Sequence, residues 1–187
     1  MAFLAAACTT GEAGTPLPVD RTATSPTPAT TTSSPGSTPF TASVNDVITQ
    51  INLQLPILVE NGTPTSLPVT IGPDGTFGGP VTPTTEIRLI PQGNAFEPVA
   101  AVTVRTRATA GTLLTPARLL SGIGAALYSL SSDAVAAFGD DVLPRLSALD
   151  QTRTTITVGT FYDLTIVVID ASELTYTFTP IGVAAPV

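Results

Sequence analysis

The 187-residue chain contains no histidine, no tryptophan and one cysteine, and all seven of its basic residues are arginine. Without histidine, a Ser-His-Asp or Cys-His catalytic arrangement cannot form. Without lysine, the chain has neither a Schiff-base nucleophile nor a phosphate-loop lysine. A single cysteine cannot form an internal disulfide or a structural zinc site. The composition therefore predicts a protein that is not an enzyme and that needs no cofactor.

Acidic residues dominate the charge, with a formal net charge of −7 and a pI near 4.2. Phosphate-backbone binding needs clustered positive charge, so we expect no nucleic-acid partner. Paired carboxylates could act without histidine, but Asp163 and Asp170 are seven residues apart and would point to opposite faces of one strand. Asp140 and Asp141 fit a helix start better. Calcium at Asp74 or at the Asp140-Asp141 pair is a minor alternative, because no loop has an EF-hand pattern, and we expect no metal site.

Residues 9–39 differ sharply in composition from the rest of the chain. All but five of them are Thr, Ser, Pro, Gly or Ala. Such a segment cannot bury enough apolar surface to offset its ordering entropy, so it is predicted to be a disordered tether. The remaining residues, 40–187, are enough for a single globular domain.

The sequence Leu4-Ala5-Ala6-Ala7-Cys8 precedes this tether. A small-residue run that ends in the only cysteine, before a Ser/Thr/Pro-rich tether, resembles the processing site of bacterial lipoproteins, although leucine stands four rather than three positions before the cysteine. The Arg-only, Ala/Thr/Pro-rich usage is similar to that of envelope lipoproteins of high-GC Gram-positive bacteria such as mycobacteria. The resemblance implies a truncated signal and lipidation segment at 1–8 and lipid attachment to Cys8. It also implies an extracytoplasmic location, anchored to the cell membrane.

The segment 47–55 can be interpreted in two ways. Its apolar residues alternate over nine positions and many are β-branched, which favours a strand. A helix also fits the apolar spacing, with Ser43 and Asp46 resembling a capping box. We favour the strand. Asn61-Gly62 is then predicted to turn a hairpin between 56–60 and 63–71.

The other predicted strands are 86–90, 99–107, 152–158, 161–169 and 174–179. The apolar run 164–169 indicates a central strand that is covered on both faces. Between the two groups of strands, Thr115 and Pro116 are predicted to begin a helix. Ser132 is expected to cap a second helix and Asp141 a third that ends near Leu149.

This order of elements predicts an α+β fold. We expect an antiparallel sheet of about six to eight strands, with the helical segment at about 115–149 packed on one face. The sequence shows no internal repeat of useful length.

Four arginines share the polar side of their predicted strands: Arg88, Arg105, Arg107 and Arg153. If these strands are neighbours, their guanidiniums could offer bidentate donors to a carboxylate or a phosphate. The more ordinary alternative is a solvated sheet face balanced by nearby acids.

Gly122 and Gly124 interrupt the apolar stripe of the first helix in this segment. They lack the third glycine and the strand-to-helix turn of a dinucleotide site. Their small size leaves room either for the protein's own sheet or for a bound acyl chain.

These observations predict an envelope lipoprotein domain of unspecified role. One alternative is a lipid or glycolipid carrier with an apolar cavity under the helix at 115–130. Another is an adhesion or protein-partner binding module, which would show an exposed apolar patch instead of a cavity.

Overall fold

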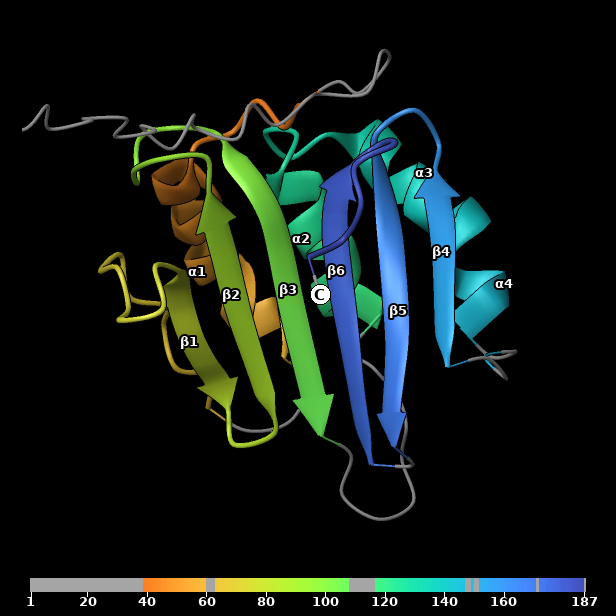
Figure 1. Cartoon of the computed structure of the whole chain (residues 1–187), viewed down its shortest axis with the longest axis horizontal. Coiled ribbons are helices and arrows are strands. Elements are labelled where there is room, and N and C mark those ends of the chain that lie inside the picture. Colours follow the sequence, from red (N-terminus) through yellow and green to blue (C-terminus); the bar gives the residue numbers. More distant parts are fainter. Residues whose placement is uncertain are drawn as a thin grey trace, which may run out of the picture. The chain divides into compact units, whose positions relative to one another are not determined.

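The computed structural model describes residues 39–59, 63–107, 117–146, 149, 152–170 and 172–186. These residues form an antiparallel sheet of six strands with helices packed on one face, which confirms the predicted α+β fold (Figure 1). In chain order the elements are α1 (Val44–Leu58), β1 (Phe77–Thr82), β2 (Thr85–Pro91), β3 (Val99–Arg107), α2 (Ala117–Ala126), α3 (Ser132–Asp141), α4 (Leu143–Leu146), β4 (Arg153–Val158), β5 (Tyr162–Asp170) and β6 (Glu173–Pro180).

The sheet order β1-β2-β3-β6-β5-β4 divides the fold into two similar halves. In each half, helical structure precedes a meander of three antiparallel strands, and the last strands of the two meanders, β3 and β6, pair at the centre of the sheet (Figure 1). This pairing runs from Val102 opposite Phe178 to Arg107 opposite Glu173. The topology thus contains a repetition that the sequence does not show.

The segment 47–55 is helical, and the strand prediction for it was wrong. Ser43 is the N-cap of α1: its hydroxyl accepts a hydrogen bond from the Asp46 amide at 3.2 Å and donates one to the Asp46 carboxylate at 2.7 Å. The buried residues of α1 recur at helical spacing, while Leu53 and Ile57 are exposed. The expected hairpin is therefore also wrong, because α1 extends to Leu58 and residues 63–70 form no strand.

Several other predictions differ from the structure in detail. The strand β1 was missed, because its Gly-Gly-Pro sequence has low strand propensity. The strand β5 is second from the edge of the sheet, and Ile169 on it is exposed, so it is neither central nor covered on both faces. Ser131, not Ser132, is the N-cap of α3, and Asp141 ends α3 instead of capping the next helix. The proposed cap at Thr115 lies outside the described residues.

The core lies between the helices and one face of the sheet. Alternating residues of β2, β3 and β6, such as Ile87, Val104 and Tyr176, are fully buried together with Leu120 and Ile123 of α2. The segment after β6 crosses the opposite face of the sheet (Figure 1). The Thr179 hydroxyl donates to the Val183 carbonyl at 3.0 Å.

Candidate functional site: the polar face of the sheet

The face of the sheet that the helices leave uncovered is rich in threonine, arginine and acidic residues. In one row across four strands, register places Thr103 opposite Thr177, Thr177 opposite Thr165, and Thr165 opposite Thr155. The Thr155 and Thr165 hydroxyls are 3.0 Å apart. Charged side chains flank this row, and three of the four arginines expected on this face lie on its β2–β3 side.

Arg105 and Arg107 share one carboxylate. Both project from β3 toward Glu173 of β6, and their side chains are 46% and 63% exposed, whereas that of Glu173 is only 11% exposed. The Arg105 guanidinium donates through Nε and Nη2 to Oε1 of Glu173, and the Nε of Arg107 donates to Oε2 at 3.1 Å. These three side chains carry two positive charges and one negative charge, and Asp170, opposite Glu173, is a second acid near Arg107.

The pKa of Glu173 follows from these contacts. Burial favours the neutral acid, but the hydrogen bonds from Arg105 and Arg107 outweigh it, so the pKa of Glu173 is lowered from its ordinary value. Glu173 is therefore ionised at neutral pH and accepts hydrogen bonds from both guanidiniums. A carboxyl group in this state is not suited to act as a general acid.

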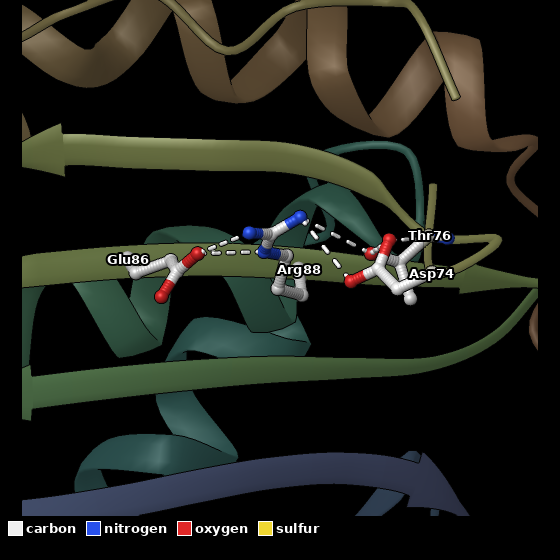
Figure 2. Close-up of polar contacts among 4 residues, drawn as sticks. All are labelled: Asp74, Thr76, Glu86 and Arg88. Atoms are coloured by element: carbon white, nitrogen blue, oxygen red, sulfur yellow. Dashed lines mark hydrogen bonds and ion pairs between the residues drawn. The ribbon is translucent and has the colours of Figure 1, made fainter. Parts of the chain in front are cut away.

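Arg88 of β2 forms a second cluster with the opposite charge balance (Figure 2). Its Nε donates to Oε1 of Glu86 at 2.7 Å, and its Nη1 lies 3.4 Å from Oδ2 of Asp74. Its Nη1 also contacts the Thr76 hydroxyl at 3.5 Å. One guanidinium thus faces two carboxylates.

Asp74 belongs to the turn that precedes β1. Its Oδ1 accepts hydrogen bonds from the amide of Thr76 at 3.2 Å and from the Thr76 hydroxyl at 2.9 Å. These bonds, with a smaller contribution from the charge of Arg88, lower the pKa of Asp74. Gly75 adopts φ +76°, a conformation that glycine tolerates without strain. Asp74 therefore orders a turn and orients Arg88, and nothing about it indicates a calcium ligand.

A shallow hollow of about 230 Å³ lies at the β1–β2 turn, beside Arg105 and Arg107. Hydroxyls, two guanidiniums, a carboxylate and proline rings line it, from Pro80, Thr82, Pro83, Thr84, Thr85, Glu86, Arg105 and Arg107. Arg107 uses only Nε for Glu173, and no other described residue bonds its two terminal nitrogens. Among the described residues, the hollow therefore offers guanidinium donors of Arg107 without a partner, beside threonine hydroxyls.

Arg153 lies on the same face but apart from the other three arginines. It is opposite Val167 at the edge of the sheet, with β5 and β6 between it and β3. No hydrogen bond or ion pair joins it to another of the described residues. The predicted set of four thus separates into two acid-paired clusters on β2 and β3 and one exposed arginine on β4.

The two glycines of α2 lie against the protein's own side chains. A Cβ at Gly122 would lie 2.8 Å from a Leu58 methyl group of α1, and a Cβ at Gly124 would overlap the Tyr162 hydroxyl oxygen of β5. Both glycines thus allow close packing, of helix on helix and of helix on sheet. The space where a bound acyl chain was considered is occupied at these two positions.

The Tyr162 hydroxyl is fully buried and has no hydrogen-bond partner among the described residues. Burial raises its pKa, and Tyr128 and Asp141 add to this effect. The neighbouring Tyr128 ring stacks on it at 6.4 Å, and the Tyr128 hydroxyl donates to the Phe161 carbonyl. Burial raises the pKa of Tyr128 to about 12. Both phenols are neutral at physiological pH.

The sequence patterns did not identify the acids that pair with the arginines of this face: Asp74, Glu86 and Glu173. Glu86 could have been found, because it precedes Arg88 by two residues on one strand and so shares its face. Glu173 could not, because its approach to Arg105 depends on the pairing of β3 with β6, 68 residues apart. Cys8 lies outside the described residues.

Within the described part of the chain, no group of three or more Cys, Asp or Glu side chains could hold a metal ion. No helix in that part is long and apolar enough to cross a membrane. Comparison of the chain with protein-family models, curated proteins and solved structures gave no match.

Proposed function

We propose that this chain is a non-enzymatic, lipid-anchored domain of the cell envelope that binds an anionic group of a partner through the polar face of its sheet. The observation that carries the binding proposal is the Arg105–Glu173–Arg107 cluster beside the hollow. Two guanidiniums share Glu173, and the terminal nitrogens of Arg107 bond no other described residue, so the cluster has donors for a further anion. A carboxylate or phosphate on a partner would complete the pairing.

The anchoring part of the proposal rests on the sequence around Cys8 and the tether at 9–39. A tether of this composition would hold the folded domain away from the membrane while leaving it free to reorient. A polar sheet face displayed in this way could meet soluble or surface-bound partners.

The non-enzymatic part is supported by the states of the acids. The pKa values of Asp74, Asp170 and Glu173 are all lowered. Each shift has hydrogen bonds to neighbouring groups among its causes, and general acids near neutral pH need shifts in the opposite direction. Together with the lack of histidine and lysine, this favours recognition over catalysis.

Lipid carriage finds less support in the geometry than binding on the polar face. Leu58 and Tyr162 already contact the backbone of α2 at Gly122 and Gly124, where a cavity was considered. The Tyr162 hydroxyl, which has no partner among the described residues, would also be a poor neighbour for an acyl chain, because the chain offers it no acceptor.

The binding proposal is tested by NMR titration of the full chain with two probes, acetate and inorganic phosphate. We expect saturable shift changes at Thr82–Glu86 and at Arg105 and Arg107, which Arg107→Gln weakens. The matched control is Arg145→Gln, which removes the same charge from α4. Equal responses of the two variants, or shifts spread evenly over the surface, would contradict a site at the hollow.

The anchoring proposal is tested separately by detergent partitioning of the chain expressed behind a complete signal sequence in a high-GC Gram-positive host. A lipidated Cys8 should hold the protein in the detergent phase, and Cys8→Ser should move it to the aqueous phase. Equal partitioning of the two forms would remove the anchor but leave the binding proposal untouched.

A further inference from the structure

The two edge strands of the sheet, β1 and β4, differ in whether another segment of the chain pairs with them. At the β1 edge, the amide of Thr65 donates to the Val81 carbonyl at 2.8 Å, and Ile71 forms an isolated bridge with Phe77. Asn52 of α1 fixes this covering segment through two hydrogen bonds to the backbone of Leu67, at 3.0 and 2.7 Å. The chain itself therefore closes the β1 edge.

No described segment of the chain pairs with the outer edge of β4. The Val168 amide donates to the Thr152 carbonyl at 2.9 Å, so alternation along the strand directs the backbone groups of 154, 156 and 158 toward β5. The N–H and C=O groups of Arg153, Thr155 and Thr157 then point away from the sheet. No hydrogen bond joins these outward groups to another described residue.

The composition of β4 does nothing to discourage strand pairing. Its sequence, Arg-Thr-Thr-Ile-Thr-Val, contains no proline, glycine or lysine, and five of its six residues are β-branched. Edge strands of monomeric proteins are usually short, bulged, interrupted by proline or covered, since an open edge is a template for another strand. In β1, Pro80 and a register shift hinder pairing with a further strand, whereas β4 is regular throughout.

We propose that β4 pairs with β4 of a second copy of this chain, antiparallel and across a two-fold axis at Thr155. In this register the outward backbone groups of Thr155 in one copy face those of Thr155 in the other. Those of Arg153 face those of Thr157 of the second copy. With the axis at Thr155, three pairs of outward-facing residues oppose each other within the strand, whereas an axis at Thr154 or Ile156 leaves two. Closed two-fold symmetry is the commonest arrangement of identical subunits.

The same register supplies charge complementarity. Arg153 has no partner among the described residues of its own copy, and it would lie opposite Thr157 of the second copy. The Thr157 hydroxyl donates to Asp163 at 2.7 Å, which places that carboxylate one strand farther along the same row. Two strand spacings of about 4.8 Å then separate Arg153 from this acid, a distance over which an arginine side chain laid along the sheet can approach it. The symmetry gives this contact twice.

The pairing also extends features that already exist in one copy. The threonine row from Thr103 to Thr155 would continue without a shift into the same row of the second copy. A two-fold axis perpendicular to the sheet keeps the helices of both copies on one face, so α3, which packs against β4, would face its counterpart, with α4 following it along the chain (Figure 1). Val135 and Leu143 are exposed apolar side chains on these two helices.

The first test is sedimentation of the full chain carrying Cys8→Ser, over a wide concentration range because a strand-edge interface is small and its dimer weak. We expect a monomer–dimer equilibrium that Thr155→Pro abolishes. Proline at 155 removes an amide that points away from β5, so the intramolecular ladder is retained, and far-UV circular dichroism checks this. Arg153→Glu should weaken the dimer, because it places two acids in one row. The control Arg21→Glu, in the tether, makes the same change of net charge and should not.

The second test is a symmetric cysteine cross-link. Directly opposed residues of a hydrogen-bonded antiparallel pair have Cα atoms about 5.5 Å apart, within the range of a disulfide. Thr155→Cys in the Cys8→Ser background should therefore form a covalent dimer under mild oxidation, and Thr84→Cys, on the β1–β2 turn, should not. A chain that remains monomeric at all concentrations, or a dimer that survives Thr155→Pro, would overturn the proposal.

Discussion

Gly122 and Gly124 lie where any larger side chain would meet a neighbouring residue. An interior glycine costs a helix about 1 kcal/mol relative to alanine. In α2 this cost is offset by close approach, since Leu58 and the Tyr162 hydroxyl lie where side chains at these positions would start. The two glycines thus set how near α2 lies to α1 and to the sheet.

Gly124→Leu should destabilise the protein by about 1–3 kcal/mol, because the added side chain overpacks a filled site. Thermal melts of this variant and of Gly139→Leu measure the effect. A Cβ at Gly139 meets nothing within 4 Å, so Gly139→Leu controls for loss of a helical glycine alone. If Gly124→Leu left stability unchanged and reduced uptake of a fluorescent lipid, a ligand cavity would be the better interpretation.

The two stacked tyrosines should respond oppositely to loss of their hydroxyls. Tyr162→Phe removes a buried hydroxyl without a partner and should leave stability unchanged or raise it by about 1 kcal/mol, whereas Tyr128→Phe loses the bond to Phe161 and should cost about 1 kcal/mol. Because burial raises the pKa of both phenols, the stability they contribute is present below pH 10 and lost as pH rises above it. Chemical denaturation at pH 7 and pH 11 measures both effects. A loss in Tyr162→Phe as large as that in Tyr128→Phe would indicate that the Tyr162 hydroxyl has an unseen partner, such as a buried water.

At the scale of elements, α1 depends on its cap and on the face that it buries. Val47, Ile51 and Leu55 pack in the core, while Leu53 and Ile57 remain exposed on the other side. The alternation that suggested a strand arises because apolar residues occupy both faces of the helix. The cap at Ser43 fixes where the helix begins, and Asn52 then ties it to the segment that closes the β1 edge.

Ser43→Ala should destabilise the protein by about 0.5–2 kcal/mol, because it removes the bond to the Asp46 amide and the bond to its carboxylate. Ser131→Ala is the matched comparison at the start of α3, where the bond to the Ala134 amide is longer, at 3.4 Å, and the loss should be smaller. Urea titrations of both variants rank the two caps. The reverse order would mean that the Ser43 contacts contribute little in solution.

At the scale of the whole molecule, the seam between β3 and β6 joins the two halves of the chain. The Arg105–Glu173–Arg107 cluster crosses this seam on the polar face, while Val104 and Tyr176 cross it in the core. The cluster that carries the binding proposal therefore also links the halves. Binding of an anion at Arg107 would act on a contact that both halves share.

The contribution of this seam to the stability of the protein should decrease at low pH. The folded-state pKa of Glu173 is lowered, so the stability that it contributes is present above the ordinary glutamate pKa of 4.5 and is lost as pH falls through the folded-state value. Glu173→Gln should lower the melting temperature at pH 7, and its difference from the unaltered chain should shrink below pH 4.5. Calorimetry between pH 7 and pH 3 measures this. A difference that stays constant with pH would show that the ionised carboxylate contributes nothing at the seam.

The sequence by itself determined the class of the fold and the limits on its chemistry. The strands β2 to β6 were predictable because alternation of apolar and polar residues is a property of neighbouring positions, and the absence of histidine and lysine excludes the catalytic arrangements that use those two residues. Only the tertiary structure decided between strand and helix for α1. Its apolar residues fit both the strand and the helix repeat, and only packing in the core shows which of them are buried. The tertiary structure also decided which acid meets which arginine, since the pairing of β3 with β6 depends on contacts between residues far apart in the chain. The two unlike edges of the sheet were likewise not readable from sequence, because whether an edge is covered depends on where a distant segment such as 63–72 comes to lie.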